Sequence, residues 1–192
     1  MKATVKPARM SYLKFEDARV LMQATSISEV LSVAQEVIGR MPTPIRWIGG
    51  PLTSGTNPHE VNRANIHRAI LWSKEQGIST FNYLIFQKHV LHIARRDFWK
   101  RLPLRERVKR RIKHRGRRFL STEEEYGCQR RLLEEFYTPL FKQAMIGELW
   151  LLSGWYASLN AWHLRRFCLE HGIRVYEVPA ERALVPKGLM PL

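Results

Sequence analysis

Short apolar runs and amphipathic helical patterns alternate along this chain, and this alternation restricts its fold more than any other feature. Four runs have the apolar, aromatic or β-branched residues and the flanking turn residues of core strands. They are residues 45–48, 79–86, 149–152 and 173–178. Strands that alternate with helices favour a parallel sheet joined by right-handed crossovers. The sequence therefore predicts an α/β fold with a Rossmann-like parallel sheet and helices on both faces.

Amphipathic helical patterns lie around and between these runs. Ser26 and Glu29 have the spacing of a capping box, and the apolar periodicity after them predicts a helix over 30–38. Residues 122–127 are acidic and read as a turn-like link. Further helices are expected over 57–77, 130–144 and 161–171.

The chain has 192 residues, of which 45% are hydrophobic, so it can bury one substantial core. We therefore expect one α/β domain over 41–180. Residues 1–40 are predicted to form an N-terminal helical arm, whose first 25 residues are a loose or irregular segment. A basic helical insertion is expected over 95–120, and residues 181–192 are expected to be a C-terminal tail.

Positive charge is concentrated in one segment. Lys and Arg number 32 against 17 Asp and Glu, which gives a net charge of +15. The segment 95–118 contains thirteen Lys or Arg and two acids, so it carries +11 of that charge. Such a field attracts phosphate-rich polymers or anionic surfaces. The other interpretation is an ordinary solvated helix face.

The basic segment has an apolar row of its own. Leu104, Val108 and Ile112 follow each other at helical spacing and are expected to anchor one face, with cations on the other. The aromatic residues Phe98 and Trp99, with Phe119 beyond the row, can stack on unpaired bases or pack in the core. The predicted nucleic-acid contacts are Arg105, Arg107, Lys109, Arg110, Arg111, Lys113, Arg115, Arg117 and Arg118.

Several protein classes are disfavoured by what the sequence lacks. Cys128 and Cys168 are too few for a disulfide framework, and both are expected to be reduced thiols. The N-terminus has no unbroken apolar stretch, and no stretch is long enough to span a membrane, so a cytoplasmic location is expected. The seven histidines do not have the spacing of a zinc site. No metal or cofactor is predicted.

Two loops follow predicted strands and can bind a ligand. The first, 49–55, is rich in glycine, which lets backbone N–H groups approach an anion at the start of the next helix. It lacks the Walker A and GxGxxG spacings. The second, 153–158, offers serine hydroxyls and an indole, although an ordinary strand-to-helix turn has the same residues.

Together the two loops resemble a known family. The first loop reads IGGPLTSG and the second reads LLSGWYAS, with Ala161 after it. This pattern is similar to the nucleoside 2-deoxyribosyltransferase superfamily, including its nucleotide N-glycosidase relatives, over residues 45–90 and 132–178. The resemblance implies a pocket for a nucleoside or nucleotide, with the first loop holding the sugar or its 5′-phosphate. The ligand-binding residues that it implies are Gly50, Pro51, Ser54, Gly55, Asn62, Trp155 and Ser158.

The chain departs from that family at the catalytic residue. The family uses a glutamate on the helix after the second loop to attack the anomeric carbon, and a carboxylate suits an oxocarbenium-like centre. Leu164 occupies the corresponding position, with His163 before it. Of the positions near 139–140 and 147–148 where the family has further acids, only Glu148 is acidic. The candidate replacement carboxylates are Glu124, Glu125, Glu134 and Glu135, for which the other interpretation is an ordinary acid on a helix surface.

Two functions are expected from these patterns. The first is a nucleoside-binding or nucleotide-binding protein of the deoxyribosyltransferase type that has lost its catalyst; an active form would cleave or transfer at an N-glycosidic bond. The second is a nucleic-acid-binding or assembly protein that contacts RNA or DNA through 95–118. A membrane surface or an acidic protein is a third partner for the same charge. The resemblance also implies a homo-oligomer, because family members often complete their sites across a dimer.

Overall fold

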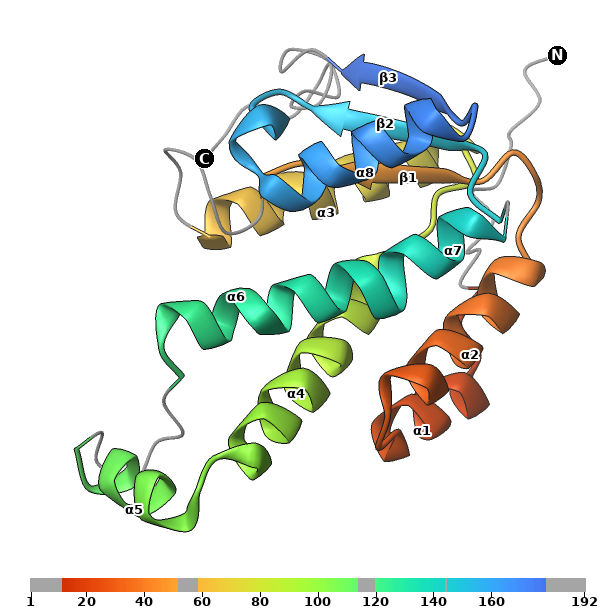
Figure 1. Ribbon diagram of the computed structural model, residues 1–192. Helices are drawn as coiled ribbons and strands as arrows, with labels where there is room; N and C mark the ends of the chain where they lie inside the picture. The colour runs from red at the N-terminus through yellow and green to blue at the C-terminus, as the bar shows by residue number, and fades with distance from the viewer. Residues whose placement is uncertain (1–11, 52–58, 114–119, 144, 179–192) are drawn as a thin grey trace, which may run out of the picture.

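The structure is a computed structural model that describes residues 12–51, 59–113, 120–143 and 145–178 (Figure 1). Most of these residues are helical, and a small sheet lies at one side of the molecule. The elements in chain order are α1 Phe15–Gln23, α2 Ile27–Gly39, β1 Arg46–Gly49, α3 His59–Glu75, α4 Tyr83–Arg101, α5 Leu104–Lys113, α6 Thr122–Arg131, a π-helical stretch Leu132–Tyr137, α7 Thr138–Lys142, β2 Glu148–Leu152, a 3-10 turn Trp155–Ala157, α8 Leu159–Glu170 and β3 Arg174–Val178.

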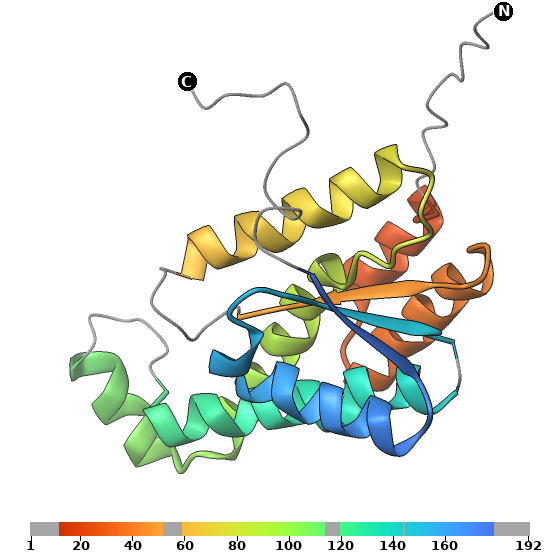
Figure 2. The same ribbon diagram turned by 90° about the horizontal axis from the view of Figure 1, so that it is seen from above.

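Three parallel strands form the sheet in the order β1-β2-β3. Figure 2 shows α3 on one side of the sheet and α8 on the other. The mixed α/β character and the parallel strands are therefore as predicted, whereas the described residues do not confirm the full Rossmann-like arrangement. The structure confirms the predicted strands at 45–48, 149–152 and 173–178.

The predicted strand at 79–86 is wrong. Thr80 makes one isolated parallel bridge to Arg46, and α4 begins three residues later at Tyr83. The buried side chains of this region recur at helical spacing, because they pack beneath the sheet from one side of a helix. They are Tyr83, Leu84, Phe86, Gln87 and Val90. The aromatic and β-branched residues of this region are typical of a strand, but packing against the core stabilises a helix instead.

The core beneath β1 is aromatic. The Trp47 ring stacks on the Tyr83 ring with centroids 4.3 Å apart. The ring of Tyr137 meets Trp47 edge-on at 4.9 Å, and the Phe141 ring lies at 5.2 Å. Such contacts hold aromatic rings in specific relative orientations. They hold α4 and the π-helical stretch against β1, and so determine which side chains lie beneath the carboxyl end of this strand.

The N-terminal segment is more regular than expected. Within residues 12–25, α1 buries Leu21 and the carboxylate of Asp17, which forms an ion pair with Arg40. Because α1 buries so few residues, its sequence has no sustained apolar periodicity, and for this reason the sequence predicts an irregular segment here. The expected capping of α2 is present, since the Ser26 hydroxyl accepts from the Glu29 amide at 3.3 Å.

The acidic link predicted at 122–127 is the first part of α6. Ser121 caps this helix: its hydroxyl accepts from the Glu124 amide at 3.3 Å, and its own amide donates to the Glu124 carboxylate at 2.6 Å. Helical structure then continues to Lys142, so the helix expected at 130–144 starts earlier. None of the described helices is both long and apolar enough to cross a bilayer.

Candidate functional site

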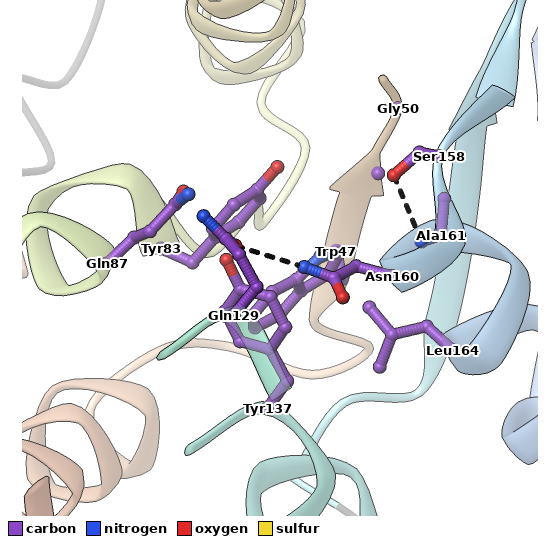
Figure 3. Close-up of a pocket in the computed structure, with 11 residues that line it drawn as sticks. Trp47, Gly50, Tyr83, Gln87, Gln129, Tyr137, Ser158, Asn160, Ala161 and Leu164 are labelled. Atoms are coloured by element: carbon purple, nitrogen blue, oxygen red, sulfur yellow. Dashed lines mark hydrogen bonds between the residues drawn. The ribbon is translucent and has the colours of Figure 1, made fainter. Parts of the chain in front are cut away.

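A small cavity lies at the carboxyl ends of β1 and β2, where parallel sheets bind ligands (Figure 3). Its lining comes from β1, α4, α6, the π-helical stretch and the start of α8. The polar lining side chains are Tyr83, Gln87, Gln129, Tyr137, Ser158 and Asn160. The rest of the lining is Trp47, Gly49, Gly50, Ala161 and Leu164. The cavity thus brings together the ends of both predicted ligand loops.

The first loop leaves β1 with little space around it. A Cβ atom on Gly49 would lie 3.1 Å from Leu151 Cδ2, and one on Gly50 would lie 3.4 Å from Leu152 Cβ. Side chains at these positions would push the loop away from β2. Gly50 lines the cavity, whereas Pro51 does not. The predicted ligand residues Ser54 and Gly55 lie outside the described residues.

The second loop ends at the N-terminus of α8. Gly154 has a positive φ of 82°, and a Cβ atom there would lie 3.8 Å from Pro51 Cγ, so the two loops meet at this point. Ser158 is buried and caps α8, because its Oγ accepts from the Ala161 amide at 3.3 Å. Its hydroxyl proton remains available to a ligand in the cavity.

Two residues implied by the resemblance lie away from the cavity. Trp155 is half-buried beside the guanidinium of Arg165, which sits 5.2 Å from the ring centroid. Asn62 is buried in α3. Neither side chain lines the cavity. The structure thus brings together Gly50 and Ser158 from the implied set.

Leu164 lines the cavity from α8 and is almost fully buried. The position that the resemblance gives to the nucleophile therefore faces the site, but its side chain is a hydrocarbon. No carboxylate belongs to the described lining of the cavity. An acid that could trap an oxocarbenium-like centre is absent from that lining.

Glu148, the acid that remained at a family position, lies at the opposite end of β2. Its buried carboxylate accepts from Arg46 Nε at 2.6 Å and from Trp150 Nε1 at 3.1 Å. An Arg174 guanidinium nitrogen lies 2.9 Å from its other oxygen. Glu148 therefore ties the three strands together at the edge away from the cavity.

The four proposed replacement acids are held by arginines. Glu124 pairs with Arg110, Glu125 with Arg95, Glu134 with Arg130 and Glu135 with Arg131. None of the four lines the cavity. Ion pairing of this kind is the ordinary role of acids on helix surfaces.

Two buried polar atoms at the cavity have no hydrogen-bond partner within the part of the chain that the structure describes. They are the Tyr137 hydroxyl and the Gln87 carbonyl oxygen, Oε1. Burial, together with the neighbouring Tyr83, raises the pKa of Tyr137 well above its usual value, so the phenol stays protonated. Buried polar groups normally find partners, and an unpaired one costs free energy. A polar ligand that forms hydrogen bonds with these two atoms would remove this free-energy cost.

A π-helical stretch carries Tyr137 into this position. Residues Leu132–Tyr137 form the wider helical turn, with Phe136 and Tyr137 both buried. Such turns are uncommon and occur frequently at functional sites, because they change the direction in which following side chains point. Figure 3 shows the side chains of Gln87, Gln129 and Tyr137 gathered around a common space.

A larger groove adjoins the cavity on its outer side. The cavity itself has a volume of about 20 Å³, which suits one water molecule. The groove, between α6 with the π-helical stretch and α8, has a volume of about 440 Å³ and shares Gln129 and Asn160 with the cavity. These two amides separate the spaces through one long contact, from Asn160 Nδ2 to Gln129 Oε1 at 3.4 Å (Figure 3).

The basic helix α5 presents most of its cations to solvent. Arg105, Lys109, Arg111 and Lys113 are exposed, and Arg107 is half-buried. Arg110 instead binds the carboxylates of Glu106 and Glu124 on its own helix and on α6. The predicted contacts Arg115, Arg117 and Arg118 lie outside the described residues.

The apolar row of α5 does not anchor the helix to the core as expected. Leu104, Val108 and Ile112 are 69%, 48% and 77% exposed, and no residue of α5 is buried. The aromatic residues behave differently, since Trp99 is buried and Phe98 is half-buried. A buried ring cannot stack on a base. Phe119 lies outside the described residues.

Local sequence patterns do not indicate most of the polar residues that line the cavity. The sequence predicts Tyr83 as part of a strand and Tyr137 as a helix position, and it assigns Gln87 and Gln129 to neither. Asn160 follows the second loop directly and was within reach of a motif search. No protein-family model, curated protein or solved structure that was compared with this chain matches it.

Proposed function

We propose that this chain binds a nucleoside or nucleotide at the carboxyl ends of β1 and β2 and does not cleave it. The observation that carries the proposal is the pair of unpartnered buried atoms, on Tyr137 and Gln87, beside Gly50 and Ser158. A ligand that supplies hydrogen bonds to both atoms removes the cost of leaving them unpaired.

The chemistry of the described lining suits a base and a sugar. Gln87, Gln129 and Asn160 are amides, each offering donors and an acceptor, which is the pattern that the polar edges of nucleobases complement. Ser158 and the backbone at Gly50 lie where the resemblance expects sugar or phosphate oxygens. The side chains that line the cavity are uncharged, because burial raises the pKa of Tyr83 and Tyr137 and keeps both phenols protonated. Recognition therefore rests on hydrogen bonds.

Entry requires the two amides to separate. The contact between Gln129 and Asn160 is weak at 3.4 Å, and both side chains are half-buried. Rotating them joins the cavity to the adjoining groove, whose volume lies in the range of small-molecule sites. The ligand can then extend from the cavity into the groove.

The absence of cleavage follows from Leu164. Catalysed cleavage of an N-glycosidic bond needs a group that attacks the anomeric carbon and a group that protonates the leaving base. Leucine supplies neither, and the described lining of the cavity has no carboxylate in its place. The groove is lined by Glu134 and Glu170, but each of these acids forms an ion pair with an arginine. Recognition can persist where the chemistry has been lost.

The test is a calorimetric titration of the full chain with deoxyribonucleosides, ribonucleosides and their 5′-monophosphates. We expect saturable binding of at least one of them, weakened about tenfold or more in Gln87→Met. Gln23→Met, at an exposed position of α1, is the matched control and should bind as the wild type does. Chromatography of each mixture should show no free base.

Two results contradict the proposal in different ways. If no nucleoside or nucleotide binds, or if Gln87→Met binds as tightly as the wild type, the ligand site is wrong. If free base accumulates, the site is right and the chain is an enzyme whose catalytic residue lies elsewhere.

A further inference from the structure

Helix α5 lies at the end of the molecule away from the sheet, between the ends of α4 and α6 (Figure 1). Arg110 holds it there: its Nε donates to Glu106 Oε1 at 2.7 Å, and its Nη1 donates to Glu124 Oε2 at 2.6 Å. The same Glu124 carboxylate caps α6. One side of α5, bearing Glu106 and Arg110, is therefore turned toward α6.

The opposite side of α5 is apolar. Residues at i, i+4 and i+8 share a helix face, and at about 100° per residue the row of Leu104, Val108 and Ile112 points away from Glu106 and Arg110. The exposure of these three side chains agrees with that geometry. A row of hydrocarbon in water at the tip of a molecule is unfavourable unless a partner covers it.

Cations border the apolar row. Helical geometry places Arg105 on one side of the row and Arg111 on the other, with Lys109 and Lys113 farther round, and all four are exposed. Lys100 and Arg101 at the end of α4 are exposed as well. The surface of α5 thus combines an apolar ridge with a positive margin.

We propose that α5 docks on an anionic lipid surface, with the apolar row between the lipid headgroups and the cations against them. This is the side-chain pattern of helices that lie in the plane of a membrane interface. The proposal is independent of the nucleoside site.

Other partners fit this surface less well. A polynucleotide is bound through its phosphates and would leave the apolar row in water. A second copy of the chain, docked through the same face, would bring the cations of both helices together. A bilayer with acidic headgroups can both cover the apolar row and pair with the cations that border it.

The docking should be reversible and should need both features. A row of three residues buries little apolar surface, and short anchors of this kind hold only with help from headgroup charge. We expect the full chain to float with vesicles of phosphatidylcholine containing about 30% phosphatidylserine, and to bind pure phosphatidylcholine at least about tenfold more weakly.

Two triple variants separate the contributions. Leu104→Ser/Val108→Ser/Ile112→Ser removes the row, and Arg105→Gln/Lys109→Gln/Arg111→Gln removes much of the margin. Each should weaken vesicle binding about tenfold or more. The matched control is Val20→Ser/Leu71→Ser/Leu169→Ser, at exposed apolar positions on other helices, which should bind as the wild type does.

A second readout does not depend on loss of binding. The single variant Val108→Trp should show a blue-shifted indole emission when the phosphatidylserine vesicles are added, because the ring leaves water. Unchanged emission, or equal vesicle binding by the serine triple variant and the wild type, would overturn the proposal. Binding to polynucleotides without binding to the vesicles would overturn it too, and would make α5 a nucleic-acid surface.

Discussion

At the scale of single residues, Leu164 limits what the cavity can do. It occupies the position at which the resembled family attacks the sugar, and it faces the site with its neighbour one turn back, Ala161. A hydrocarbon cannot attack a sugar, so in the function proposed above the cavity binds a ligand without reacting with it.

Restoring a carboxylate at this position should not restore an enzyme. Leu164→Glu places an acid among buried groups, where burial raises its pKa, so the unfolded state ionises first. The loss of stability relative to the wild type should be smallest below about pH 4, where the carboxyl group is neutral, and should grow by about 3 kcal/mol as the pH rises to 7. Urea unfolding at both pH values measures this. Equal destabilisation at both, or release of free base, would contradict it.

The two cysteines should be inert in the folded chain. Burial raises the pKa of Cys168 to about 12, and burial is also the largest cause raising the pKa of the fully buried Cys128 thiol. At pH 8 the thiolate fraction of Cys168 is about one in ten thousand. Iodoacetamide should modify neither residue until denaturant is added, as followed by mass spectrometry. Rapid labelling of the native chain would show that these thiols are accessible.

Sequence motifs found some residues of the site and missed others for a physical reason. Gly50, Ser158 and Leu164 lie in two short segments whose local pattern can be read directly. Tyr137 and Gln87 come from helices far apart in the chain, and only the fold brings them to the cavity. The position of Tyr137 depends on its contact with the Trp47 ring, which no local sequence pattern indicates.

At the scale of elements, the junction between α5 and α6 depends on Glu124. Its carboxylate accepts from both Arg110 and the Ser121 amide, so one side chain caps α6 and holds α5. The Ser121 to Glu124 spacing is a capping box in the sequence, and it could have identified a helix where a turn was predicted. No comparable motif distinguishes a helix from a strand at 79–86, because the aromatic residues of this region fit either conformation.

The contribution of Glu124 should depend on pH. Its hydrogen bond with Arg110 is the main cause that lowers its pKa below the usual 4.5. Its stabilising effect is then fully present above that value and is lost as the pH falls through the folded pKa. Glu124→Gln should cost about 1 kcal/mol at pH 7, and the difference from the wild type should shrink below pH 4. A cost that does not change with pH would mean that charge is not involved.

At the scale of the whole molecule, the two proposed surfaces lie apart. The cavity is at the carboxyl edge of the sheet, and α5 is at the far end of the helices that support it (Figure 1). The sequence also assigns the basic residues and the two ligand loops to different segments, although the first residues of the basic segment belong to the end of α4. It could not show that the apolar row of α5 faces solvent, because that depends on which side binds α6.

The separation predicts that the surfaces act independently. The triple serine variant of α5 should bind nucleosides within about twofold of the wild type, because sites that share no partners contribute additively. Calorimetry with the same ligand series checks this. A loss of nucleoside affinity comparable to the loss of vesicle binding would mean that α5 belongs to the ligand site.

The most direct test of the central claim is Tyr137→Phe, measured for stability and for nucleoside binding together. The variant removes a buried hydroxyl that has no partner among the described residues, and keeps the ring against Trp47. We predict that the unfolding free energy stays equal or rises by about 1 kcal/mol, while nucleoside affinity falls about tenfold or more. A less stable protein with unchanged affinity would contradict the account, because the hydroxyl would then serve the fold and not a ligand.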